Sequence, residues 1–192
     1  MQILSKKPAP RVLEIGVDRG VTMFPLVTAM AGYCESFMYM GVDVKVQDSV
    51  RFTLNYMPPP IPGSCFLMER NSLDILPELV EQQMKFDLIL LDGDHNYHTV
   101  SKELEYMNSL LVQDGLMVID DYDGKWADRD LWYADRDGYE ENKLVTRPVE
   151  SEKSGVKPAV DEWLARVGWN SAKMIQGEPL LVSRMQLKAG SP

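Results

Sequence analysis

Short apolar runs alternate with longer amphipathic stretches along the first 120 residues of this chain. Apolar runs of about 4–8 residues are typical of buried parallel strands, whereas apolar residues spaced three or four apart indicate helices. The pattern predicts strands at 11–16, 37–43, 65–69, 86–91 and 116–119, alternating with helices at 20–31, 46–56, 73–84 and 97–112. This order predicts one α/β domain over residues 1–192, built on a parallel sheet.

Residues 121–155 break this alternation, because acids, arginines and aromatic residues occur there without periodicity. A long connection of this kind is usually functional, which predicts a substrate-covering lid or a mobile segment. Helical spacing returns at 156–167, and two further strands are expected at 172–175 and 180–185. The short separation at 176–178 suits a hairpin, so one of these two strands must run antiparallel.

The formal net charge is −9, with a sequence pI near 4.7. Nucleic-acid binding needs a positive surface that displaces counterions, so this charge argues against a nucleic-acid partner. No apolar stretch has the length of a signal peptide or a membrane span, and no membrane association is expected. Cys34 and Cys65 lie far apart without a CxxC motif, which favours reduced cysteines in a cytoplasmic protein.

A glycine-containing turn, EIGVDRG at residues 14–20, follows the first predicted strand. Gly16 and Gly20 let the backbone bend sharply and approach a ligand, although an ordinary strand-to-helix turn uses glycine too. The turn lacks the lysine of a phosphate loop and does not match the dinucleotide pattern G-x-G-x-x-G. Glu14 and Asp18 would repel a pyrophosphate, but they suit the ammonium and sulfonium groups of S-adenosylmethionine.

Polar residues also end the second and third predicted strands. Asp43 can accept hydrogen bonds from both ribose hydroxyls of an adenosine, as acids do in dinucleotide sites, or it can serve a turn or helix cap. Asn71 and Ser72 can meet the edge of an adenine or cap the next helix, and the sequence leaves both roles open.

The fourth predicted strand runs into Asp92-Gly93-Asp94-His95, at the edge where open α/β sheets hold their active sites. Asp92 and Asp94 are predicted to contact the cofactor. His95 is the candidate general base because imidazole titrates near neutral pH, with a purely structural hydrogen bond as the alternative.

Asp120 and Asp121 end the fifth predicted strand, which should neighbour the fourth. Asp92, Asp120 and Asp121 would then gather at one place and repel each other unless a cation bridges them. Oxygen ligands favour a hard ion, Mg²⁺ or Ca²⁺, and solvated loop acids are the alternative.

At these residues the chain resembles the class I S-adenosylmethionine-dependent methyltransferases. The closer likeness is to the small-molecule O-methyltransferase group that includes macrocin O-methyltransferase and cephalosporin hydroxylase-type proteins. It runs from about residue 11 to 165 and is carried by VLEIGVDRG, MGVD, RNSLDILPEL, FDLILLDGDHNYHTVSKEL, GLMVIDDY and GVKPAVDEWL. The resemblance implies a Rossmann-like sheet of seven strands, order 3-2-1-4-5-7-6, with strand 7 antiparallel and helices on both faces.

The resemblance also implies roles for single residues. The turn at Gly16 would hold the methionine part of the cofactor and Asp43 its ribose, while Asp92 and Asp121 would bind Mg²⁺ and His95 would act as the base. The chain departs from the family's usual Gly-Asp-Ser after the third strand, where it has Arg-Asn-Ser at 70–72.

Two further departures concern the metal and the cover of the substrate pocket. Tyr122 stands where several metal-dependent relatives carry asparagine. Relatives usually have a helical cover before the first strand, and here the cover is expected from residues 121–155 or from a second subunit of a homodimer.

These patterns predict methyl transfer from S-adenosylmethionine to a hydroxyl of a small-molecule acceptor, assisted by Mg²⁺. One rival is the same transfer without a metal, and another is a protein that binds the cofactor without catalysis. A nicotinamide-dependent dehydrogenase is the third rival, which the glycine spacing disfavours.

Overall fold

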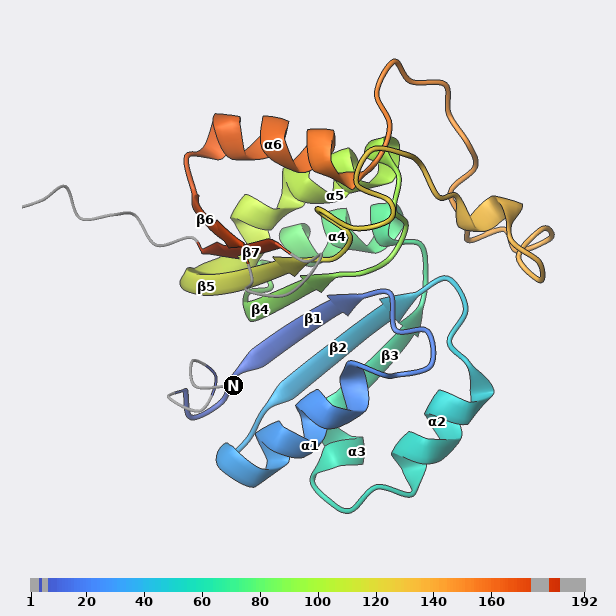
Figure 1. Ribbon diagram of the computed structural model, residues 1–192. Helices are drawn as coiled ribbons and strands as arrows, with labels where there is room; N and C mark the ends of the chain where they lie inside the picture. The colour runs from blue at the N-terminus through green and yellow to red at the C-terminus, as the bar shows by residue number, and fades with distance from the viewer. Residues whose placement is uncertain (1–3, 5–6, 174–179, 184–192) are drawn as a thin grey trace, which may run out of the picture.

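Five strands pair in parallel at the centre of this computed structural model, which describes residues 4, 7–173 and 180–183 (Figure 1). Because every strand runs in the same direction, the carboxyl ends of all five meet along one edge of the sheet. In spatial order they are β3 (Cys65–Glu69), β2 (Met38–Asp43), β1 (Arg11–Ile15), β4 (Phe86–Leu91) and β5 (Leu111–Ile119).

The whole sheet has the strand order 3-2-1-4-5-7-6, the order that the resemblance implies, but its parallel part holds only the first five of these strands. The five strands that carry the site, in the order 3-2-1-4-5, all pair in parallel. Antiparallel pairing is confined to a short extension at the edge of the sheet, where β7 (Leu180–Ser183) pairs with β5 and β6 (Asn170–Lys173) pairs with β7. Each of these two strands has only four residues. The predicted hairpin turn at 176–178 and the predicted strand ends at 174–175 and 184–185 lie outside the described residues.

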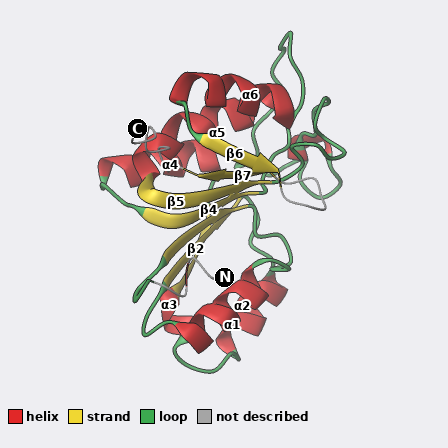
Figure 2. Cartoon of the chain, turned by 60° about the vertical axis from the view of Figure 1, so that its left-hand side comes forward, coloured by secondary structure: helices red, strands yellow, loops and turns green. Residues whose placement is uncertain are grey.

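Helices cover both faces of the sheet (Figures 1 and 2). Alternate residues of a strand point to opposite faces, so Val12 joins one hydrophobic core whereas Leu13 joins the other. No helix among the described residues is both long and apolar enough to span a membrane. One face packs against α1 (Met23–Tyr33), α2 (Asp48–Asn55) and α3 (Ile61–Ser64), the other against α4 (Ser72–Glu81), α5 (Tyr97–Leu110) and α6 (Val156–Val167).

The sequence of α5 determines where that helix begins and which face it buries. The Asn96 side chain accepts a hydrogen bond from the Thr99 backbone amide at 2.7 Å and so caps the first turn. Leu104 and Met107, three residues apart, are fully buried in the core. Glu103 lies on the same buried face and is the only ionisable residue among the buried positions of α5. This exception places a carboxyl group inside the molecule.

The strand β5 begins five residues earlier than the sequence predicts. Asp114 and Gly115, a residue pair typical of turns, lie inside the strand, because the pairing with β4 shifts register between Phe86 and Leu88. The turn-forming residues are therefore accommodated as an irregularity within the strand rather than as a loop before it.

Residues 121–155 hold little regular structure beyond a 3₁₀ turn, η2 (Tyr133–Asp135), and lie beyond the carboxyl edge of the sheet (Figure 1). They are hydrogen-bonded to that edge at several points. The Leu131 amide donates to the His95 carbonyl at 3.0 Å, and the Asn142 side chain donates to the Val44 carbonyl at 2.8 Å. The segment is thus tied to the ends of both β4 and β2.

Candidate functional site

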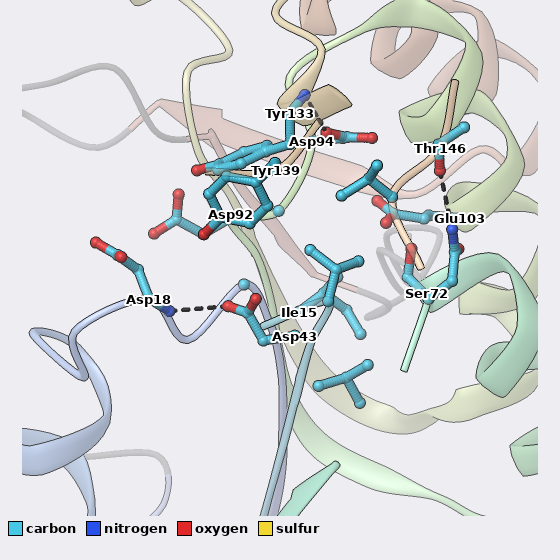
Figure 3. Close-up of a pocket in the computed structure, with 16 residues that line it drawn as sticks. Ile15, Asp18, Asp43, Ser72, Asp92, Asp94, Glu103, Tyr133, Tyr139 and Thr146 are labelled. Carbon is cyan, nitrogen blue, oxygen red and sulfur yellow. Dashed lines mark hydrogen bonds between the residues drawn. The ribbon is translucent and has the colours of Figure 1, made fainter. Parts of the chain in front are cut away.

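A cavity opens at the carboxyl edge of the sheet (Figure 3). The backbone brings the strand ends together there, since the Asp92 amide donates to the Ile15 carbonyl and the Asp120 amide to the Leu91 carbonyl, at 2.8 and 2.9 Å. Glu14 and Gly20 do not line this cavity. The predicted cofactor residues that do are Gly16, Asp18, Asp43, Asn71, Ser72, Asp92 and Asp94.

The turn at Gly16 can be formed only by glycine. Gly16 has a φ of +89°, and a Cβ atom there would lie 2.0 Å from the Asp92 carbonyl oxygen. Any side chain would therefore push the ends of β1 and β4 apart. This close approach places the turn and Asp92 on the same wall of the cavity.

Asp43 organises the glycine turn. Its Oδ2 atom accepts hydrogen bonds from the backbone amides of Val17 and Asp18, at 2.8 and 2.9 Å, and its Oδ1 atom accepts from the Lys45 amide at 2.9 Å. Asp18 itself has a φ of 42°, and its largely exposed side chain pairs with Arg19 at 3.2 Å. Asp43 thus holds the turn in shape and also lines the cavity. Its predicted contact with a ribose stays a prediction.

Glu14 lies in β1, just before the glycine turn, and does not line the main cavity. It accepts a hydrogen bond from the Tyr39 hydroxyl, and it lines a smaller cavity together with Thr22, Asp92 and Asp120. Burial raises the pKa of Glu14 to about 7, although the Tyr39 hydroxyl opposes the shift.

Asn71 uses its side chain for structural hydrogen bonds. Its Oδ1 atom accepts from the Leu73 amide at 2.7 Å and caps α4, the role that the sequence left open beside adenine binding. Its Nδ2 atom donates to the Leu144 carbonyl at 2.7 Å and to the Thr146 hydroxyl at 3.1 Å. Asn71 therefore fastens the 121–155 segment to the end of β3.

Asp94 makes a similar connection at the end of β4. It accepts hydrogen bonds from the Thr99 hydroxyl at 3.2 Å and from the Tyr133 amide at 3.3 Å. Burial raises its pKa to about 6, because these hydrogen bonds offset only part of the cost of removing the charge from water. The residue lines the cavity from the side of the 121–155 segment.

Three residues at the ends of β4 and β5 can offer ligand atoms to one metal ion. One atom each from Asp92, His95 and Asp120 lies within 4.8 Å of the others. Burial raises the pKa of Asp92 to about 8, and repulsion from Asp120 adds to the shift. Two carboxylates held this close resist joint ionisation, and a cation between them removes that repulsion. The pair Asp92 and Asp120 therefore has the donor chemistry of a Mg²⁺ site.

Asp121 lies on the other side of His95 and is not in this cluster. Its Oδ2 atom is 3.5 Å from His95 Nδ1, whereas His95 Nε2 faces Asp92 Oδ1 at 3.7 Å. A positive φ of 54° at Asp121 turns the chain there. Burial lowers the pKa of His95, which the nearby acids oppose. Tyr122 points away from the cluster and donates to Asp161 of α6.

Sequence reasoning missed several residues of the cavity. Tyr133, Tyr139 and Thr146 line it from the 121–155 segment, whose lack of periodicity gave no indication of which side chains turn inward. Glu103 lines it from α5 and is fully buried. Its signal was present in the sequence, because an acid stands between Val100 and Leu104 on the apolar face of that helix.

The model of one protein family, described as "Methyltransferase domain", matches residues 13–122 of this chain. That range begins in β1 and ends just beyond β5, so it contains the strand ends that form the cavity. Among curated proteins, none matches this chain.

Solved structures resemble the chain in fold. One is CalS11, a TDP-rhamnose 3'-O-methyltransferase of calicheamicin biosynthesis, with a TM-score of 0.63 and 14% identity over 95% of this chain and 74% of its own. Another is the MycE methyltransferase of the mycinamycin pathway, solved with Mg, SAH and mycinamycin VI, with a TM-score of 0.55 and 16% identity over 96% of this chain. This chain spans about half of MycE, 47% of its length.

A third similar structure is a SAM-dependent methyltransferase from Methanosarcina mazei, with a TM-score of 0.51 and 10% identity. The match covers 93% of this chain and 94% of that protein. At these identities the likeness concerns the arrangement of strands and helices.

Proposed function

Because this chain belongs to the methyltransferase-domain family, whose model covers residues 13–122, we propose that it transfers the methyl group of S-adenosylmethionine to a hydroxyl oxygen of a small molecule. One observation carries the proposal: the glycine turn, an acid-lined cavity and the cluster of Asp92, His95 and Asp120 meet at a single edge of the sheet. Cofactor, acceptor and base can therefore reach each other.

The cavity suits a cationic nucleoside rather than a phosphorylated one. Asp18, Asp43, Asp92 and Asp94 line it, so its lining carries carboxyl groups where a phosphate would need donors. The turn at Gly16 is close to Asp92, and this pair suits the ammonium and sulfonium of the methionine part. Asp43 lies farther along the cavity, and its carboxylate, which already accepts three backbone hydrogen bonds, keeps a lone pair on Oδ1 for a ribose hydroxyl.

His95 is placed to move the proton of the acceptor hydroxyl. In the proposed reaction the Nε2 atom takes that proton, the acceptor oxygen forms a bond to the methyl carbon, and the carbon–sulfur bond breaks to leave S-adenosylhomocysteine. Asp121, facing Nδ1, stabilises the imidazolium that results. Much of the rate in such a transfer comes from holding oxygen, carbon and sulfur in line.

Asp92 and Asp120 would hold Mg²⁺. When bound there, the ion lowers the pKa of the acceptor hydroxyl and orients it. These two acids suit a cation because the pKa of Asp92 is raised, which reflects its burial and the unrelieved repulsion between Asp92 and Asp120. Asp120 takes the place that the family resemblance gave to Asp121.

The 121–155 segment supplies the cover over the cavity in this proposal. Tyr133, Tyr139 and Thr146 come from it, which supports the first of the two covers that the sequence left open. A homodimer stays a prediction. A cytoplasmic location also stays a prediction, which rests on the free cysteines Cys34 and Cys65.

Titration calorimetry tests the cofactor assignment directly. S-adenosylmethionine and S-adenosylhomocysteine are expected to bind with one site per chain, and NAD is expected to give no heat, because the cavity lining repels its pyrophosphate. Retention of NAD with no response to either sulfur compound would overturn the proposal. Binding without turnover on a panel of hydroxylated acceptors would instead favour the non-catalytic rival.

A matched pair of variants tests the metal site. Asp120→Asn is expected to weaken Mg²⁺ binding by at least about tenfold, because one of two charged ligands is lost. Asp121→Asn should leave Mg²⁺ binding unchanged, since Asp121 faces the far side of His95. Calorimetry with MgCl₂ in the presence of S-adenosylhomocysteine measures both. The reverse result would show that Asp121, and not Asp120, is the metal ligand. Activity that survives a chelator would favour methyl transfer without a metal.

A further inference from the structure

Glu103 carries an unpaired polar atom inside the protein. Its side chain is 1% exposed, and its Oε1 atom has no hydrogen-bond partner among the described residues. A buried acceptor without a partner costs about 1–3 kcal/mol, and native proteins leave few of them. An atom of this kind that faces a cavity points to a ligand that supplies the missing donor.

The carboxyl group of Glu103 lies at the end of the cavity farthest from the glycine turn. Figure 3 shows Glu103 beside Ser72 and Thr146, with Asp43 between this group and the pair Asp18 and Asp92. On the proposed function, the methionine part of the cofactor lies by Asp92 and the ribose by Asp43. The purine ring is then left at the end that holds Glu103.

Other groups at this end are already engaged. Asn71 uses Oδ1 to cap α4 and both Nδ2 protons to hold Leu144 and Thr146, so it has no amide proton free for the purine. Ser72 is hydrogen-bonded to Glu103. Among the residues described, the Oε1 atom of Glu103 is the buried side-chain acceptor at this end of the cavity that has no partner.

We propose that Glu103 is a specificity-determining residue, whose Oε1 atom accepts a hydrogen bond from the 6-amino group of the cofactor's adenine. This inference rests on the proposed function, because it needs the cofactor to lie in the cavity. It gives α5 a role in selecting adenine.

The environment keeps the Glu103 carboxyl group neutral around neutral pH. Burial raises its pKa to about 8; the bond with Ser72 opposes this shift and the charge of Asp94 adds to it. A neutral carboxyl group carries its proton on one oxygen, and the other oxygen remains a carbonyl acceptor. A neutral acid can accept from an amino group without holding a buried charge.

Two ligands and two variants test the proposal by calorimetry. The ligands are S-adenosylhomocysteine and its 6-deamino analogue, whose purine carries hydrogen at C6. The wild-type protein is expected to bind the analogue about tenfold more weakly, the value of one buried hydrogen bond. In Glu103→Leu this ratio should fall to about one, because the acceptor is gone, whereas Glu103→Gln keeps an amide oxygen and should keep the ratio.

Thermal unfolding of the ligand-free protein gives an independent readout. Glu103→Leu is expected to raise Tm, because a similarly sized apolar side chain replaces an unsatisfied buried acceptor. A residue that served only the fold would lower Tm when replaced. Glu105→Gln, on the exposed side of the same helix, is the matched control and should change neither Tm nor the ligand ratio.

The outcomes separate this inference from the proposed function. If the wild-type protein fails to bind S-adenosylhomocysteine, the proposed function itself fails. If it binds S-adenosylhomocysteine but Glu103→Leu weakens both ligands equally, or keeps the wild-type ratio, the role of Glu103 is overturned while the function stands.

Discussion

Replacing His95 with alanine is expected to lower kcat for methyl transfer by about 10²–10⁴-fold, the contribution of a positioned general base. The affinity for S-adenosylhomocysteine should stay unchanged, because the glycine turn and Asp43 do not depend on the imidazole. Because burial lowers the pKa of His95, the acidic limb of the wild-type pH–rate profile should fall below the usual histidine range near 6.5. Initial rates are measured as S-adenosylhomocysteine formed with the best acceptor from a panel of sugars and phenols.

His98→Ala is the matched control, since His98 is the only other histidine in the chain. Its ring lies 6.3 Å from that of Trp132 and does not line the cavity. An unchanged kcat in His95→Ala would remove His95 from the mechanism. A loss of Mg²⁺ binding in the same variant would make His95 a metal ligand instead of the base.

The free energy of unfolding of the ligand-free protein is expected to fall by several kcal/mol as the pH rises from about 4.5 to about 8. Burial raises the pKa of Glu103 to about 8 and that of Glu14 to about 7, from an ordinary value of 4.5. The folded protein keeps these protons over that window, whereas the unfolded chain releases them near pH 4.5. Unfolding therefore releases protons there, and rising pH favours it. Glu103 alone contributes up to about 4 kcal/mol at pH 8.

Urea unfolding at pH 5 and at pH 8 measures this dependence. Glu103→Gln cannot titrate at this position, so its stability should fall less between the two pH values than that of the wild-type protein. Glu105→Gln removes an exposed carboxylate from the same helix and should keep the wild-type dependence. Equal slopes in Glu103→Gln and the wild type would show that Glu103 is ionised in the folded protein.

Elements with a strong local pattern were predicted with their observed bounds. The strands Cys65–Glu69 and Phe86–Leu91 and the helix Val156–Val167 are confirmed, because apolar runs and helical spacing specify them without long-range help. The start of β5 was wrong, since Asp114-Gly115 carries a local turn signal that pairing with β4 overrides. The places of β6 and β7 in the sheet came from the family resemblance alone, because strand order at an edge depends on pairing between distant segments.

Part of the cavity lining was also predicted from the local sequence pattern. Gly16, Asp92 and Asp94 follow buried strands directly, so their position at the carboxyl edge follows from the order of strands alone. Asn71 was less predictable, because an asparagine after a strand can serve a ligand or a helix cap. Only contact with Leu144 and Thr146, more than seventy residues away, engages its amide.

Local patterning was thus enough to establish alternating strands and helices, a glycine-containing turn after the first strand, and acids at the ends of neighbouring strands. Tertiary packing determined where each acid points and which groups it faces. Asp120 joins Asp92 while the adjacent Asp121 turns behind His95, and helix packing buries Glu103 beside the cavity. The physical reason is that a side chain's direction, its desolvation and its distance from other charges arise from segments far apart in the chain, which periodicity does not encode.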